Sequence, residues 1–172
     1  MNTQLPATVT DERSQTAFRQ AFQRHSAGVA IVTAADITGR PTGFTATSLA
    51  SLSAQPPMLT FNLATSSSSW EALTETNHVA VHMLGVRNRA LAARMAGPRA
   101  NRFVGDHWHR GEFNLPILND VTAVLIGTII QRNVVHGAAC IVAKVVGGYQ
   151  GEDDAGLLYR ERVYLAPQPL TD

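Results

Sequence analysis

Two clusters of hydroxyl-bearing residues are the segments of this sequence best suited to binding chemistry. The first covers residues 43–57, where Thr45, Thr47 and Ser51 recur among small residues. Their period of two is typical of a β-strand with two usable faces, so we expect one strand over residues 43–53. Small side chains let a flat ligand approach the backbone, and hydroxyl groups and free edge amides can then bond its rim. The segment indicates a site for a planar ring, and the alternative is a plain hydroxyl-rich edge strand.

The second cluster is Ser66, Ser67, Ser68 and Ser69, which leads into residues 70–73. Serine is a preferred residue at helix N-termini, and such ends bind phosphate. A helix cap without a ligand is the alternative. Together the two clusters predict a site for a flat ring at one end and a phosphate at the other.

Length and charge narrow the class of protein. The chain of 172 residues is long enough for one domain with a full core. We expect a disordered tail over residues 1–10 and a single domain over residues 11–172. The formal net charge is +1 and Lys144 is the only lysine, so charge-driven binding of nucleic acid is not expected.

Cysteine and histidine content give little support to a metal site. Cys140 is the only cysteine, which excludes an internal disulfide and a cysteine cluster for zinc or iron–sulfur. His107 and His109 have strand-like metal spacing, but no third ligand is evident, so we expect a loop there and no metal. Residues 1–14 lack a secretory signal pattern, and the longest apolar stretch, residues 121–130, is too short to span a bilayer. These features favour a cytoplasmic location.

The hydrophobic pattern predicts a mainly β fold. Helices are expected over residues 11–25, 69–76 and 88–96. Strands are expected over residues 29–34, 43–53, 58–63, 78–84, 122–132, 136–149 and 157–164. Strands follow one another without regular helical crossovers, and no G-x-G-x-x-G follows a strand, which argues against a doubly wound dinucleotide fold. We therefore expect an antiparallel barrel with helices packed outside. Arg87, Arg89 and Arg94 are expected on a solvated helix face, where one of them could meet an adenylate phosphate.

Four short motifs occur in a definite order along this pattern. They are G-F-T-A-T-S-x-x-S-x-S-x-x-P-P at residues 43–57, S-S-x-S at 66–69, V-H-M-L at 81–84 and A-G at 96–97. This arrangement resembles the flavin reductase family, the small reductase components of two-component flavin-dependent monooxygenases. The resemblance runs from about Phe18 to Tyr164, and shared order and spacing make it specific. It implies an antiparallel FMN-binding split β-barrel of Greek-key type with a few short flanking helices, assembled as a homodimer.

The resemblance also implies which residues bind flavin, either FAD or FMN, in a groove near the dimer interface. Residues 45–49 would line the isoalloxazine and ribityl part, and the serine cluster would hold the phosphate. Gly97, Arg102 and Phe103 would lie near the phosphate or adenylate end. The implied set is Thr45, Ala46, Thr47, Ser48, Leu49, Ser51, Ser66, Ser67, Ser69, Gly97, Arg102, Phe103 and Tyr159.

His136 matches a family histidine near the nicotinamide and is the implied catalytic residue, in a positioning role. Val134 and Val135 stand where the family often has Gly-Asp, so the acidic neighbour is missing. Tyr159 could close the same pocket. NADH is favoured over NADPH because no clear basic cluster could take a 2′-phosphate.

The resemblance implies an NAD(P)H:flavin oxidoreductase that supplies free reduced flavin to a separate monooxygenase. Hydride would pass from nicotinamide C4 to flavin N5, so the protein needs no nucleophile, and no Ser/His/Asp signature or P-loop is evident. Two alternatives remain: a split-barrel protein that carries or senses flavin without turnover, and a non-catalytic barrel whose hydroxyl strand serves only dimer packing.

Overall fold

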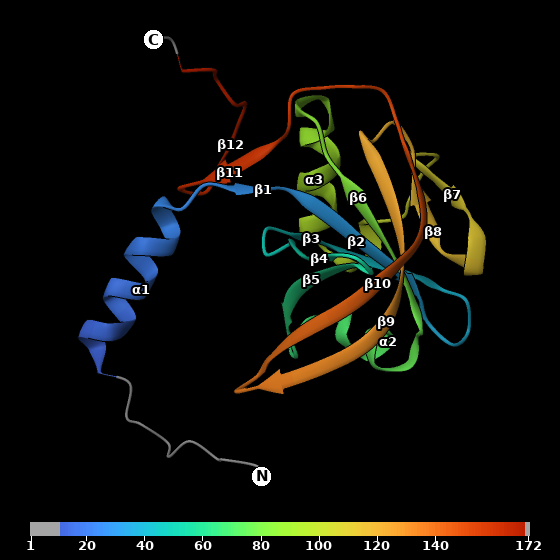
Figure 1. Cartoon of the computed structure of the whole chain (residues 1–172), viewed down its shortest axis with the longest axis horizontal. Helices are drawn as coiled ribbons and strands as arrows, with labels where there is room; N and C mark the ends of the chain where they lie inside the picture. Colours follow the sequence, from blue (N-terminus) through green and yellow to red (C-terminus); the bar gives the residue numbers. More distant parts are fainter. Residues whose placement is uncertain (1–10, 171–172) are drawn as a thin grey trace.

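The computed structural model describes residues 11–170 and is mainly β (Figure 1). Its largest sheet has seven antiparallel strands in the order β3-β2-β6-β9-β10-β5-β4. The strands are β2 (Ala30–Ala35), β3 (Pro41–Ala46), β4 (Ala50–Ala54), β5 (Pro57–Ala64), β6 (His78–Met83), β9 (Ala123–Val135) and β10 (Ala138–Gln150). The expected tail over residues 1–10 lies outside the described residues.

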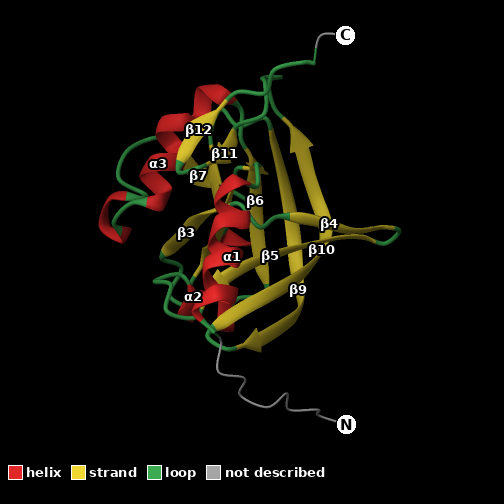
Figure 2. Cartoon of the chain, turned by 90° about the vertical axis from the view of Figure 1, so that its left-hand side faces the viewer, coloured by secondary structure: helices red, strands yellow, loops and turns green. Residues whose placement is uncertain are grey.

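Two smaller sheets and three α-helices complete the described chain. One sheet pairs β1 (Ala27–Gly28), β11 (Leu158–Arg160) and β12 (Val163–Leu165), and the other pairs β7 (Trp108–Arg110) with β8 (Pro116–Leu118). The helices are α1 (Glu12–Arg24), α2 (Trp70–Glu75) and α3 (Arg89–Ala96), with single 3-10 turns η1 (Val86–Asn88), η2 (Arg99–Asn101) and η3 (Glu112–Asn114). Figure 2 shows the curved sheet with α2 and α3 on one side and β9 and β10 on the other.

Hydrophobic residues fill both faces of the central strands. Along β2, Val32 belongs to the core enclosed by the curved sheet, and Ile31 belongs to a second core beneath α3 and β8. This division follows from the alternation of side chains along a strand. Phe61 of β5 is completely buried in the first core, and Met95 of α3 in the second. The second core thereby fixes α3 against the sheet.

His82 of β6 is a buried polar residue that links β2 to the end of β8. Its side chain is completely buried, and its Nδ1–H donates to the carbonyl of Ile31 at 3.2 Å. Its Nε2 accepts from the backbone N–H of Leu118 at 3.0 Å. Since one ring nitrogen donates and the other accepts, the imidazole is neutral. Burial lowers the pKa of His82 to about 4.

The single strand expected over residues 43–53 is wrong. β3 ends at Ala46 and β4 begins at Ala50, so the chain leaves the ladder between them. The Ser48 hydroxyl accepts from the backbone N–H of Asn62 at 2.8 Å and lies 3.2 Å from its carbonyl oxygen. A side chain thus replaces backbone pairing at this point, which periodicity alone does not reveal. The contact also brings the end of β3 beside β5.

The strand expected to begin at His136 is also wrong at its start. His136 and Gly137 form the two-residue turn between β9 and β10, with φ values of 46° and 79°. Two consecutive positive φ values are typical of the type I′ turns that join tightly paired strands. His136 is therefore an exposed residue at a hairpin tip.

The helix α1 is present as expected, with Asp11 as its N-cap. Phe18 and Phe22 lie on one face with ring centroids 4.5 Å apart. No α1 residue is buried, and the helix stands apart from the body of the domain (Figure 1). Within residues 11–170, no helix combines the length and apolar character needed to cross a membrane.

Candidate functional site

Arg102 brings together three segments that are far apart in the sequence. Its guanidinium donates to the carbonyl of Gly43 at 2.7 Å, to the carbonyl of Gly97 at 3.0 Å and to the hydroxyl of Ser68 at 3.3 Å. The start of the hydroxyl-rich segment, the end of α3 and the serine cluster therefore meet at one guanidinium. We call Gly43, Ser66–Ser68, Gly97 and Arg102 the Arg102 cluster.

The four serines have different surroundings. Ser69 is completely buried; its hydroxyl accepts from Thr42 Oγ1 at 3.1 Å and donates to the Gly43 carbonyl at 3.3 Å. Ser67 is half-buried and accepts from the Ser69 N–H at 3.3 Å, whereas Ser66 and Ser68 are exposed. Ser69 therefore has a structural position, and its hydroxyl is not accessible to a ligand. Ser68 belongs to the predicted serine cluster but not to the implied flavin-binding set, and it is the serine that contacts Arg102.

The expected helix N-terminus is short. α2 has six residues, and its N-cap Ser69 makes no side-chain capping bond. A helix of this length contributes little macrodipole, so any anion at this site depends on hydroxyls and Arg102 rather than on α2.

Residues 45–49 follow Gly43 of the Arg102 cluster closely along the chain. The Thr45 hydroxyl donates to the Ala92 carbonyl of α3 at 2.7 Å, and Ala46 is buried. Thr47 is exposed, and Leu49 packs against the first core. Because Thr47, Ser48 and Leu49 lie outside the ladder, their backbone amides are not used in strand pairing. Ser51 lies on the exposed strand β4, at the edge of the large sheet.

The hairpin tip that carries His136 is hydrogen-bonded to the residue before the serine cluster. The backbone N–H and the hydroxyl of Thr65 both donate to the Gly137 carbonyl, at 2.8 and 3.1 Å. Thr65 immediately precedes Ser66, so His136 lies at a turn anchored next to the Arg102 cluster. The structure thus places the turn with His136 beside the start of the serine cluster.

Tyr159 lies apart from this cluster in the described chain. It pairs with Ala27 in the small sheet, and its ring centroid is 5.2 Å from that of Tyr164. It also lines a cavity of about 340 Å³ with Phe18 and Phe22 of α1. Phe103 lies closer to the site, because it directly follows Arg102 and packs edge-on against Trp108 at 5.3 Å.

His107 and His109 serve local structure in the described chain. His107 Nε2 lies 2.8 Å from the Arg102 carbonyl, and His109 Nδ1 lies 2.8 Å from the Asn119 side-chain oxygen. Over residues 11–170, no three histidine, cysteine or acidic side chains group as metal ligands would. The His107 contact helps to hold the segment that carries Arg102.

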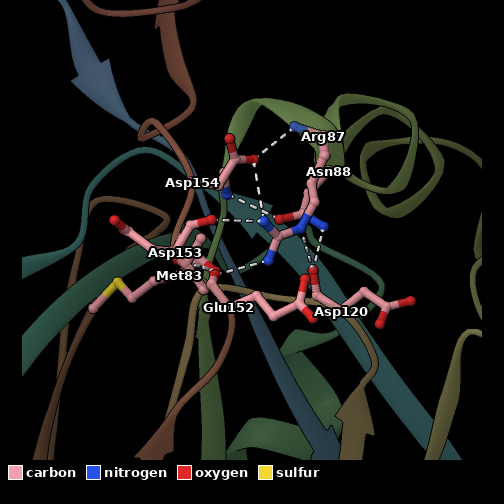
Figure 3. Close-up of polar contacts among 9 residues, drawn as sticks. Met83, Arg87, Asn88, Asp120, Glu152, Asp153 and Asp154 are labelled. Atoms are coloured by element: carbon pink, nitrogen blue, oxygen red, sulfur yellow. Dashed lines mark hydrogen bonds and ion pairs between the residues drawn. The ribbon is translucent and has the colours of Figure 1, made fainter.

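Arg87 is exposed as expected, but it lies on η1 before α3 and its guanidinium is bonded within the chain. Its guanidinium donates to the carbonyls of Asp120, Glu152 and Asp153 at 3.2, 2.8 and 3.1 Å (Figure 3). Its backbone N–H donates to the Asp154 carboxylate at 2.9 Å. The acidic turn of residues 151–156 is therefore fastened to η1, and Arg87 is a structural clamp.

Electrostatics distinguish Arg102 from the other arginines near the site. Burial, with a smaller contribution from the charge of Arg99, lowers the pKa of Arg102. Within residues 11–170, Arg102 forms no ion pair with a carboxylate. A half-buried guanidinium that bonds only to carbonyl and hydroxyl oxygens keeps its charge for an anionic ligand.

Comparison with known proteins identifies the family of this chain. A family profile described as a flavin reductase like domain matches residues 22–167. The chain belongs to this family. It is similar to an NADH:FMN oxidoreductase of Rhodococcus erythropolis, with 36% identity over 89% of this chain and 82% of the relative. It is also similar to the reductase component of a flavin-dependent trigonelline monooxygenase of Acinetobacter baylyi, with 30% identity over 87% of this chain and 48% of that protein.

The fold is shared with solved structures of the family. A flavin reductase domain protein from Arthrobacter sp. FB24 has 51% sequence identity and a TM-score of 0.89, and the match covers 92% of this chain and 98% of that one. The expected mainly β flavin reductase fold is thereby confirmed.

Proposed function

We propose that this protein is an NAD(P)H-dependent flavin reductase that reduces FAD or FMN and supplies free reduced flavin to a separate monooxygenase. The observation that carries the proposal is the Arg102 cluster, where a half-buried guanidinium without a carboxylate partner in the described chain bonds to Gly43 and to the exposed Ser68. The family relationship supplies the ligand class, because two relatives are named for flavin reduction and for a two-component monooxygenase.

The residues present fit a flavin phosphate. Arg102 offers a charged donor, and Ser66, Ser67 and Ser68 offer hydroxyl groups within the same cluster. Arginine and hydroxyl donors together recognise phosphate oxygens well. The backbone amides of Thr47–Leu49, which the ladder leaves free, are placed to bond the rim of a planar ring. This assignment rests on the positions of the donors.

The bound cofactors supply hydride transfer from nicotinamide C4 to flavin N5. The task of the chain is to hold two rings at contact distance and to exclude water between them. Residues 45–49 orient one ring, and His136 at its anchored tip orients the nicotinamide. No side chain needs to act as nucleophile.

We also propose that the curved sheet closes as a split barrel and that two copies form a homodimer. The contact of Ser48 with Asn62 beyond the end of β3 supports closure. Exposed apolar side chains on β9 and β10 support the dimer; they are Ile130, Val134, Val135 and Val146. Tyr159, remote from the cluster in one chain, would reach a site only across such an interface. A cytoplasmic location, where reduced nicotinamide is plentiful, belongs to the same proposal.

A steady-state assay tests the proposal. Purified protein is mixed with NADH or NADPH and with FMN or FAD, and absorbance at the nicotinamide band is followed. We expect oxidation that depends on added flavin and is faster with NADH. Flavin binding without oxidation in any combination would favour a flavin carrier, an alternative motivated by Val134 and Val135 in place of an acidic neighbour of His136. Absence of both binding and oxidation would leave only a structural barrel.

A further inference from the structure

Arg132 of β9 is a half-buried arginine that holds the end of α2. It lies opposite Ile141 in the β9–β10 ladder, so its side chain shares the face of the sheet on which Ile141 is buried in the first core. Leu73 of α2 is buried in the same core. The Arg132 guanidinium donates to the carbonyl of Leu73 at 2.7 Å and to the carbonyl of Thr76. A strand of the large sheet thus fastens the C-terminal end of α2.

The C-terminal end of α2 depends on donors from outside the helix. The last carbonyls of a helix have no donor within it, and basic side chains often supply one. α2 has no basic residue in its own last turn. Within residues 11–170, Arg132 forms no ion pair, and both of its side-chain hydrogen bonds go to this end of α2. Arg132 therefore supplies the donors that α2 itself lacks.

The N-terminal end of α2 carries the serine cluster. Ser69 is the N-cap of α2, and its backbone N–H donates to the Ser67 hydroxyl at 3.3 Å. Ser68, between these two residues, accepts from Arg102 at 3.3 Å. A short helix that is fixed at one end also fixes the residues attached to its other end. The positions of Ser67 and Ser68 relative to Arg102 therefore depend on where Arg132 holds α2.

The β9–β10 hairpin holds the serine cluster from its other side as well. The Gly137 carbonyl at the hairpin tip accepts two hydrogen bonds from Thr65, the residue before the cluster. Residues 65–76 are therefore fastened to one hairpin at both ends, by Gly137 and by Arg132. The same hairpin carries His136.

We propose that Arg132 is a positioning residue for the flavin phosphate: by holding the end of α2, it keeps Ser67 and Ser68 in place beside Arg102. The inference rests on the proposed function, which assigns the phosphate to the Arg102 cluster. Arg132 acts through α2 and does not contact the ligand. Its loss should weaken the binding of FMN and spare riboflavin, which has the same ring and ribityl chain without the phosphate.

Fluorescence titration of Arg132→Ala with FMN and with riboflavin tests this role. We expect the Kd for FMN to rise about fivefold to tenfold, the Kd for riboflavin to stay unchanged, and kcat at saturating FMN to be retained. Arg87→Ala is the matched control, because the Arg87 guanidinium also bonds to backbone carbonyls, in the acidic turn of residues 151–156. It should lose stability without a change in either Kd.

Three results would overturn the positioning role: an unchanged Kd for FMN in Arg132→Ala, an equal rise in both Kd values, or the same rise for FMN in Arg87→Ala. Reduction by NADH separates this inference from the proposed function. If the unaltered protein reduces neither flavin, the proposed function fails. If it reduces FMN and the two Kd values rise equally in Arg132→Ala, only the positioning role fails.

A second measurement uses the unaltered protein and so does not depend on the folding of a variant. Amide hydrogen exchange is compared with FMN and with riboflavin bound. We expect FMN to slow exchange throughout residues 65–76, including the end of α2 that Arg132 holds, more than riboflavin does. Additional protection that stops at the serine cluster would show that the end of α2 is not coupled to the phosphate, and would contradict the proposal.

Discussion

The Arg102 guanidinium and the Gly43 carbonyl are joined by a hydrogen bond of 2.7 Å. This bond connects a loop after α3 to β3, just before residues 45–49. Gly43 is closely packed, since a Cβ there would lie 2.9 Å from Met95 Cε and from the Val32 carbonyl. A rigid acceptor thus fixes the guanidinium between the hydroxyl-rich segment and Ser68. The charge at the proposed phosphate site is held in place before any ligand binds.

Replacing Arg102 tests this arrangement. Arg102→Ala removes the charge and the bonds to Gly43 and Gly97, so we expect the Kd for flavin to rise about tenfold to a hundredfold. Arg102→Lys keeps the charge, but an ammonium group cannot donate from two nitrogens in the planar geometry of a guanidinium. This variant should therefore give an intermediate Kd for flavin. Flavin binding is measured by fluorescence titration. An unchanged Kd in the alanine variant would remove Arg102 from the site.

Adding negative charge to the serine cluster tests the phosphate position. Ser67→Asp places a carboxylate where the phosphate is expected, and repulsion should weaken flavin binding about tenfold. Ser26→Asp, at an exposed position between α1 and β1, adds the same charge elsewhere and should leave the Kd unchanged. Because screening weakens surface repulsion, the effect should shrink in high salt. Equal affinity of both variants would refute the phosphate assignment.

The role of His136 can be separated from that of its turn. Asparagine tolerates positive φ and is favoured before glycine in type I′ turns, so His136→Asn should keep the hairpin. We expect a several-fold higher KM for NADH with little change in flavin affinity. A variant with an unaltered KM for NADH would show that the imidazole does not position the nicotinamide.

His82 predicts a defined acid sensitivity of folding. Its pKa is lowered from 6.5 to about 4, so the folded chain resists a proton that the unfolded chain accepts. Above pH 6.5 the stabilising neutral form is fully present. As the pH falls from 6.5 towards 4, the free energy of unfolding should decrease by up to about 1.4 kcal/mol per pH unit, and this contribution levels off below pH 4.

Nuclear magnetic resonance of the ring protons checks the His82 prediction directly. His82 should remain neutral down to about pH 4. A measured His82 pKa near 6.5 would contradict a neutral imidazole that is hydrogen-bonded at both ring nitrogens. The low pKa of Asp36, which its hydrogen bond from Thr38 produces, acts only below the ordinary value of 3.8 and so affects a lower pH range.

Loss of the Arg87 clamp should loosen the acidic turn. Arg87→Ala leaves the carbonyls of Glu152 and Asp153 without their donor, whereas the Asp120 carbonyl keeps its bond from Asn88, and we expect about 2 kcal/mol lower stability. Limited proteolysis should then cut within residues 151–156 faster than in Arg89→Ala. Gly85→Ala should act in the same direction, because a Cβ there would overlap the Asp154 carboxylate. Equal cleavage rates in Arg87→Ala and Arg89→Ala would show that the turn is held by other contacts.

Most strands could be predicted from the sequence because alternating residues such as Ile31 and Val32 are sorted onto opposite faces. The break after Ala46 could not, since it depends on Ser48 meeting Asn62, a partner distant in sequence. The His-Gly turn was missed because the apolar strand pattern continues on both sides of it. Gly137, which lies between two apolar runs, is the sequence signal that could have placed a two-residue turn there.

The candidate site, like the fold, could be predicted from the sequence only in part. Arg102 and Gly97 were linked to the serines by family resemblance, and the structure brings them together through direct bonds. The burial of Ser69 and the distance of Tyr159 from the Arg102 cluster result from packing. Neither can be predicted from the residue type alone. Ser68 belongs to the predicted serine cluster, but its contact with Arg102 depends on which segments the fold brings together and could not be read from the sequence.

Anaerobic reduction is the most direct test of the central claim. The protein is mixed with NADH and FMN without oxygen, and the absorbance bands of the nicotinamide and of oxidised flavin are recorded together. We predict that both fall in equal molar amounts, at a rate proportional to protein concentration, and that the rate drops in Arg102→Ala at low flavin. Bands that change no faster than in a protein-free control, with either FMN or FAD, would contradict the assignment of this chain as a flavin reductase.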